Sequence, residues 1–113
     1  MVRLSREVLM VKFQFRIGKA FLDYRWHPIT IPKAYYKQLE QERLAVDSVL
    51  IDSPFGTTHG KIYYGRAGFG PFYQIQMDGG HTHDPMMEFK LGQIIAVELE
   101  RVEKLIRVTL RIA

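Results

Sequence analysis

Short segments in which apolar and polar residues alternate recur along this 113-residue chain, separated by residues that favour turns. The clearest is Lys12–Ile17, where Phe13, Phe15 and Ile17 alternate with polar residues, as in a strand with one buried face. Residues expected to form strands are 12–17, 29–31, 48–52, 61–64, 72–77, 93–101 and 105–112. Seven short strands with one or two short helices predict a mainly β fold, a seven-stranded open pseudobarrel.

A strand that stops at a proline and leads directly into a helix is expected in the first half of the chain. The β-branched residues of Ile29–Ile31 favour extended structure. Pro32 disfavours helix at the residue before it, yet it fits the first turn of a helix. Apolar positions recur at near-helical spacing from Lys33 onward, so a short helix is predicted to run to about Glu42 or Arg43.

Two connections stand out between the predicted strands. Gly18–His27 mixes aromatic and charged residues without a period, and we predict an irregular segment there. Gly65–Pro71 contains three glycines and is predicted to be a long connection. Turns are also expected at Ser53–Gly56 and at Asp78–Gly80.

The composition fits one globular domain spanning residues 1–113. Lys and Arg number 16 against 12 acidic residues, and this net charge of +4 is compatible with a nucleic-acid partner. The absence of cysteine excludes disulfides and zinc sites or nucleophiles that use cysteine. No apolar run reaches the roughly 18 residues that cross a bilayer, and no signal-peptide pattern is present. We therefore expect an intracellular protein of the cytoplasm and nucleoid, or of the nucleus in a eukaryote, with no membrane partner.

Two clusters contain residue types that hold metal ions. His81–Asp84 carries two histidines and a carboxylate but lacks a third strong ligand. Glu88 and Lys90, with Asp78 or Asp84 upstream, have the outline of a nuclease centre in which two carboxylates hold magnesium. Such triplets often arise by chance, and the chain has no Gly-x-Ser-x-Gly or phosphate-loop motif. We therefore expect a protein that is not an enzyme, with no catalytic residue, bound metal or cofactor.

The order of several motifs resembles the B-three DNA-binding pseudobarrel of plant hormone-response transcription factors and of effector domains of type II restriction endonucleases. Ile31-Pro32-Lys33 matches the Ile-Pro-Lys with which a strand of the plant proteins leads into a short helix. Lys90-Leu91-Gly92-Gln93 matches a Lys-x-Gly-Asp step before an apolar strand, with Gln in place of Asp. The resemblance covers roughly residues 13–101.

The resemblance implies that the domain grips duplex DNA between two arms. The first arm is Gly18–His27, and the second is the connection between the strand ending at Tyr64 and the strand starting at Phe72. The base-contacting residues of the plant family do not match one by one, so the arms are carried over only as segments. The candidate contacts are Lys19, Asp23, Tyr24, Arg25, Trp26, His27, Tyr64, Arg66, Gln74 and Gln76.

These residue types suit DNA recognition, because Arg and Lys pair with guanine, Asp accepts from cytosine and amides read adenine. Tyr64 and Arg66 lie beside glycines, where a phosphate can approach the backbone closely. Gln74 and Gln76 share one face of their strand. Each group also has a plainer interpretation: solvated loop charges, outward glutamines without a role, and, for the two aromatic residues of the first arm, packing anchors.

We expect the chain to bind double-stranded DNA sequence-specifically, with its two arms in the major groove, as a transcription-factor or restriction-enzyme effector domain. Two alternatives stay open. One is a metal-dependent nuclease that uses Glu88 and Lys90, and the other is a small barrel for protein–protein or oligomer contacts.

Overall fold

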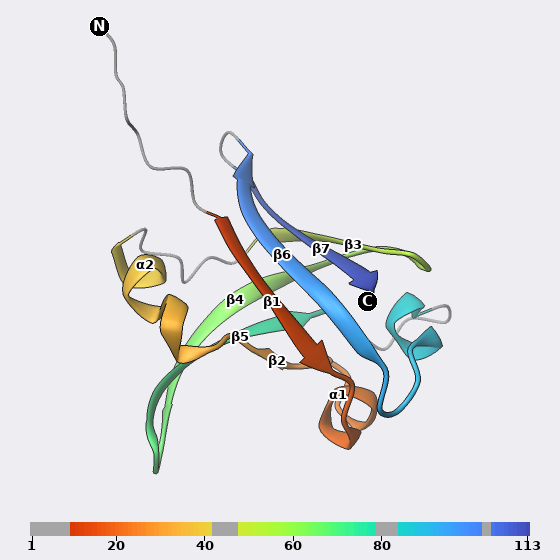
Figure 1. Ribbon diagram of the computed structural model, residues 1–113, viewed down its shortest axis with the longest axis horizontal. Coiled ribbons are helices and arrows are strands. Elements are labelled where there is room, and N and C mark those ends of the chain that lie inside the picture. Colours follow the sequence, from red (N-terminus) through yellow and green to blue (C-terminus); the bar gives the residue numbers. More distant parts are fainter. Residues whose placement is uncertain (1–9, 42–47, 79–83, 103–104) are drawn as a thin grey trace, which may run out of the picture.

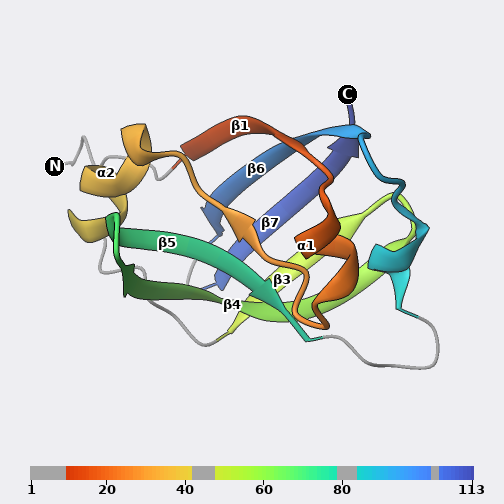
Figure 2. The same ribbon diagram turned by 90° about the horizontal axis from the view of Figure 1, so that it is seen from below.

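Hydrogen bonds join seven strands into one sheet in the order β1-β6-β7-β3-β4-β5-β2. The computed structural model describes residues 10–41, 48–78, 84–102 and 105–113. The strands are β1 (Met10–Arg16), β2 (Ile29–Thr30), β3 (Val49–Ser53), β4 (Gly56–Ala67), β5 (Gly70–Met77), β6 (Ile94–Val102) and β7 (Leu105–Ile112). The sheet curls until it nearly closes into a barrel, which confirms the predicted fold class (Figures 1 and 2).

The long strand β4 allows the sheet to curl, because its two halves pair with different strands. Its first residues, Gly56–Gly60, pair with β3, whereas Gly60–Ala67 pair with β5. Gly60 is the corner, since it lies opposite both Val49 of β3 and Met77 of β5. All strand pairs are antiparallel except β3 with β7, which run parallel.

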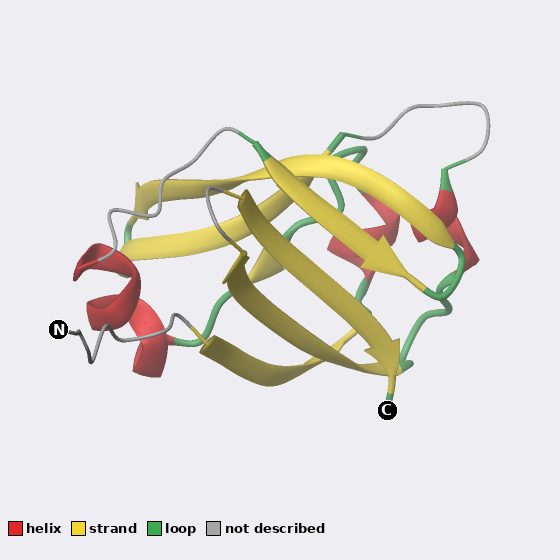
Figure 3. Ribbon diagram, turned by 90° about the horizontal axis from the view of Figure 1, so that it is seen from above, coloured by secondary structure: helices red, strands yellow, loops and turns green. Residues whose placement is uncertain are grey.

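The barrel interior is filled by every second residue of each strand, as the alternation in the sequence predicts. Fully or almost fully buried side chains from all seven strands include Val11, Ile29, Ile51, Ile62, Ile75, Val97, Leu99, Val108 and Leu110. Helical segments lie at the two ends of this wall of strands (Figure 3). Phe21 and Phe89 meet edge to face at one end, with ring centroids 6.0 Å apart.

The strand–proline–helix junction has the predicted form. Pro32 is extended, with φ −60° and ψ 145°, and it precedes a 3-10 turn η1 (Lys33–Tyr35) and then helix α2 (Tyr36–Gln41). The predicted helix end at residues 42–43 lies outside the described residues. The hydroxyl of Tyr35 donates to the carbonyl of Lys12, which ties the junction to β1.

The structure corrects both predicted connections. The first arm is not irregular throughout, because it contains helix α1 (Lys19–Asp23), whose Phe21 is buried. The second arm is not a long connection, because β4 and β5 continue as far as Ala67 and Gly70 and leave a two-residue turn. Gly70 there has φ +119°, a backbone conformation that suits glycine. Within the described stretches, no helix is long and apolar enough to cross a membrane.

Candidate nucleic-acid interface

The first arm presents a stacked pair of aromatic side chains at the surface. Tyr24 and Trp26 lie with ring centroids 4.8 Å apart and an angle of 4° between their planes. They are 49% and 42% exposed, so the interpretation of these two residues as core packing anchors is wrong. Lys19, Asp23 and Arg25 are exposed around them. The arm therefore offers both charge and flat apolar surface.

His27 is a structural residue and not a surface contact, which corrects its place among the candidates. It is 1% exposed, and its Nδ1 lies 2.6 Å from the carbonyl oxygen of Phe21. Its Nε2 lies 2.6 Å from Oδ2 of Asp84. The other carboxylate oxygen of Asp84 accepts from the backbone N–H of Met86, where it caps the 3-10 turn η2 (Pro85–Glu88). His27 thus fixes the end of the first arm to a distant segment.

Both arms are attached to the same strand, β5. The second arm is the turn from which β5 begins, and the backbone N–H of Met77, at its other end, donates to the carbonyl of Trp26 at 2.7 Å. Strand β2, which follows the first arm, pairs with β5 through Ile29 and Ile75. Figure 2 accordingly shows α1 and the tip of the β4–β5 hairpin near opposite ends of β5.

An outer face formed by β2, β4 and β5 lies between the arms. Gln74 and Gln76 point outward together, as predicted, and Gln76 Nε2 donates to Gln74 Oε1 at 2.9 Å. Gln74 Nε2 donates in turn to Thr30 Oγ1 at 3.3 Å. Lys61 and Tyr63 of β4 are directly opposite these glutamines and are exposed. The pairing Lys61–Gln76 and Tyr63–Gln74 makes one polar strip.

An aromatic ridge, defined here as Tyr63, Phe72 and Phe69, continues this face toward the tip of the hairpin. Tyr63 and Phe72 have ring centroids 5.9 Å apart, and so do Phe72 and Phe69. The two rings close over Gly65, where an added Cβ would lie 2.5 Å from Tyr63 and 2.8 Å from Phe72. The predicted approach of a phosphate to the backbone at Gly65 is therefore blocked on this face.

Tyr64 and Arg66 lie on the other face of the hairpin, so the second-arm candidates do not form one cluster. The ring of Tyr64 contacts that of Tyr73, with centroids 5.0 Å apart, and Tyr73 also meets Tyr36 of α2 at 5.3 Å. Arg66 and Tyr64 are exposed because the hairpin projects beyond the barrel (Figure 1). The hairpin thus carries exposed aromatic groups on both faces and a cation near its tip.

Tyr73 is predicted to ionise later than an ordinary tyrosine. Burial raises the pKa of Tyr73 above its usual value of 10.0, and the charges of Glu40 and Tyr64 raise it further. The stability that depends on neutral Tyr73 is present below about pH 10 and is lost as pH rises through the raised pKa. NMR titration of ring-labelled tyrosine should show this pKa falling in Glu40→Gln and unchanged in Glu100→Gln. A Tyr73 pKa at or below 10 would contradict the prediction.

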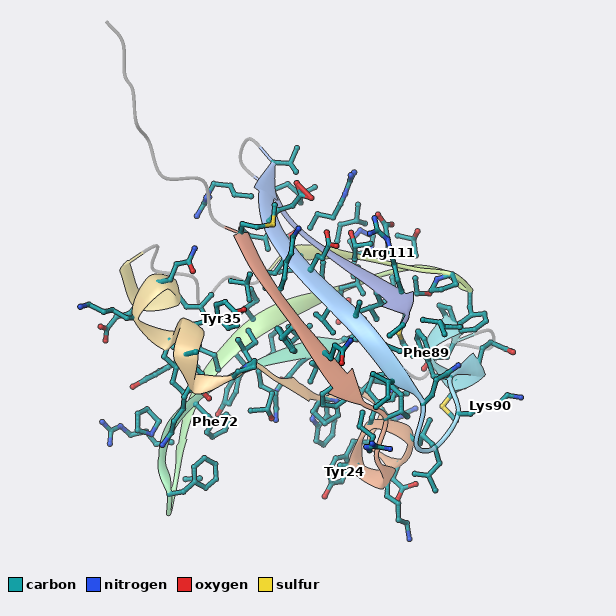
Figure 4. All side chains as sticks on the ribbon, in the orientation of Figure 1. Tyr24, Tyr35, Phe72, Phe89, Lys90 and Arg111 are labelled. Carbon is teal, nitrogen blue, oxygen red and sulfur yellow. The ribbon has the colours of Figure 1, made fainter. Side chains whose placement is uncertain are left out.

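Two arginines of β7, on the opposite wall, are paired with carboxylates. Arg107 Nε lies 3.5 Å from Asp52 Oδ2, and Arg111 lies 3.3 Å from Glu98. Figure 4 shows Arg111 on the far side of the molecule from Phe72 of the hairpin. Exposed cations of the arms and the outer face make no ion pair with any described residue: Lys19, Arg25, Lys61 and Arg66. The arms and the outer face therefore carry cations that are available to an anionic partner.

The residues considered for metal binding do not converge where they are described. Asp84 is occupied by His27 and by the cap of η2, and Phe89, between Glu88 and Lys90, is buried. His81 and His83 lie outside the described residues. Over the described ranges, no three His, Asp or Glu side chains are grouped as metal ligands would be.

The sequence interpretation missed four contributors to this surface. The alternation within β4 could have identified Lys61 and Tyr63, because both flank the buried Ile62 and therefore point to the outer face. Phe69 and Phe72 were assigned to a loop and to a strand start, respectively, and only the hairpin geometry brings their rings together.

No protein-family profile matches the chain, and no curated protein is detectably similar to it in sequence.

Proposed function

We propose that the chain binds double-stranded DNA sequence-specifically, gripping the major groove with its two arms, as the resemblance to the B-three pseudobarrel implies. The observation that carries this proposal is the attachment of both arms to β5, with unpaired cations on each arm. A duplex is a polyanion with a repeating charge, so two separate cationic arms suit it better than a single patch does. The ion-paired outer wall at Arg107 and Arg111 would face away from the duplex.

Each side chain has a distinct proposed task. Arg25 and Arg66, one on each arm, read guanine edges, since Arg pairs bidentately with O6 and N7. Lys19 and Lys61 bind phosphates and so fix the orientation of the duplex. Gln76 keeps its Oε1 and one N–H available after donating to Gln74, and this acceptor–donor pair is what bidentate recognition of adenine requires.

Duplex affinity should fall steeply with salt. Lys19 and Lys61, each neutralising one phosphate, give a slope of log affinity against log salt of about −1.8, because each contact releases counterions. A double variant, Lys19→Ala with Lys61→Ala, should remove most of this slope. Fluorescence anisotropy with a duplex, first selected from a random-sequence pool, measures both slopes.

Arg111→Ala is the matched control, because this arginine is exposed but paired with Glu98 on the opposite wall. Its slope should equal that of the wild type. Arg25→Ala and Arg66→Ala should each relax the preference at one base pair by about 1–3 kcal/mol, which a repeat of the selection would show. A wild-type affinity that is independent of salt would refute the DNA-binding proposal and favour a barrel for protein contacts.

A further inference from the structure

The tip of the second arm exposes a large apolar ring. Phe69 is 72% exposed, the highest exposed fraction among the large hydrophobic residues of the described chain. It occupies the turn between Ala67 and Gly70 together with Gly68, at which an added Cβ would meet no atom within 4 Å. The small neighbouring glycine leaves most of the ring accessible to a partner.

The ring is supported from behind. Phe72 contacts Phe69, Tyr63 contacts Phe72, and the ammonium group of Lys61 lies 5.9 Å from the centre of the Tyr63 ring. Gly65 allows Tyr63 and Phe72 to close against the strand, since any side chain there would collide with both rings. The aromatic ridge is therefore braced against β4 and β5, and Phe69 is its free end.

The charge around this apolar tip indicates the kind of partner that fits it. Arg66 lies three residues before Phe69 and Lys61 lies at the base of the ridge, and neither has an ion pair within the described chain. An apolar ring flanked by free cations matches a stack of flat apolar bases bordered by phosphates. Proteins that bind the minor groove combine Arg or Lys with an inserted Phe, Leu, Ile or Met to open one step and bend the duplex, and the same combination of groups is found here on an arm proposed to enter the major groove.

We propose that Phe69 inserts between two neighbouring base pairs of the bound duplex and unstacks them. The proposal rests on the duplex binding proposed above and adds the deformation of the DNA to it. The turn would act as a wedge, braced by Phe72 and Tyr63, next to the base pair whose guanine edge Arg66 is proposed to read. Steps that unstack easily, such as pyrimidine–purine steps, would be preferred at this position without a hydrogen bond to either base.

The test uses the selected duplex with 2-aminopurine placed in turn at each position. Wild-type protein should raise the fluorescence several-fold at one step, because 2-aminopurine is quenched when stacked, and should bend the duplex by roughly 20–90° in an end-to-end energy-transfer measurement. Phe69→Ala should abolish both signals and weaken binding roughly tenfold to hundredfold, while the salt slope stays unchanged. Phe69→Leu should retain the fluorescence signal, because leucine also serves as a wedge.

Leu91→Ala is the matched control, since Leu91 is 63% exposed and follows Lys90, which Figure 4 shows at the end of the molecule opposite to Phe72. It should behave as the wild type. Salt-dependent wild-type binding without any rise in fluorescence would overturn this inference and leave duplex binding intact. A wild-type protein that binds no duplex would refute both. If Phe69→Ala instead converts a dimer to a monomer in sedimentation, the tip is a self-association surface and the inference is wrong.

Discussion

Replacing His27 with alanine should lower the free energy of unfolding by about 3–5 kcal/mol, the range found when one partner of a buried pair is removed. The carbonyl of Phe21 can only accept, so Nδ1 of His27 donates to it, and Nε2 lies 2.6 Å from Oδ2 of Asp84. Alanine would remove the hydrogen-bond partner of both oxygen atoms at a largely buried site, where the side chains of His27 and Asp84 are 2% and 9% exposed. Chemical denaturation followed by circular dichroism would measure the loss.

The variant Asp84→Asn separates the hydrogen bonds from the charge. The amide of asparagine can donate to Nε2 of a neutral His27, while its oxygen still accepts from the N–H of Met86. We therefore expect it to lose much less stability than His27→Ala. His59→Ala, at an exposed histidine of β4, should change stability by no more than about 0.5 kcal/mol. If His27→Ala also lowered the free energy of unfolding by no more than about 0.5 kcal/mol, the contact between His27 and Asp84 would not be what fixes the end of the first arm.

Gly60→Ala should destabilise the barrel by roughly 3 kcal/mol, the upper part of the range for overpacking. An added Cβ would lie 2.2 Å from the backbone oxygen of Gln76 and 2.9 Å from Cδ1 of Ile51. The first of these atoms belongs to the neighbouring strand and cannot rotate away. Since Gly60 is the residue at which β4 exchanges β3 for β5 as its partner, relief of the collision would separate the two halves of the sheet.

Gly68→Ala provides the comparison for Gly60→Ala, because both add one methyl group to the same hairpin. Nothing lies within 4 Å of the new atom at Gly68, and the residue does not have a positive φ. Its stability should stay within about 0.5 kcal/mol of the wild type. Equal denaturation midpoints for the two variants would mean that the corner does not require close contact between the strands.

The strands were predictable because alternation is a local signal. Residues 105–112 were assigned correctly at both ends, and the junction at Pro32 was expected from three consecutive residues. The full length of β4 was not predictable, since Gly60 and its polar neighbours weaken the strand pattern, and the strand is held by two partners that are distant in sequence.

The surface formed by the arms and the outer face was only partly predictable, because some of its features depend on contacts between residues that are distant in sequence. That the glutamines of β5 share a face follows from strand geometry, and the structure has them hydrogen-bonded to each other. The burial of His27 could not be read from its own neighbours, because its partner Asp84 is 57 residues away. A histidine with φ 41° leaves no trace of that conformation in the sequence. That Tyr63 and Tyr64 point to opposite faces follows from strand geometry, but their partners on β5, Gln74 and Tyr73, required the register.

The attachment of both arms to β5 also sets a length. This strand has eight residues, Gly70–Met77, so its seven steps span about 24 Å at the rise of an antiparallel strand. B-form DNA rises about 3.4 Å per base pair, and the same length therefore corresponds to about seven base-pair steps. In the proposed complex the length of β5 would set the distance along the duplex between the contacts of the first arm and those of the second. The extent of the recognised site would then be fixed by backbone geometry, and the side chains would choose only the bases within it.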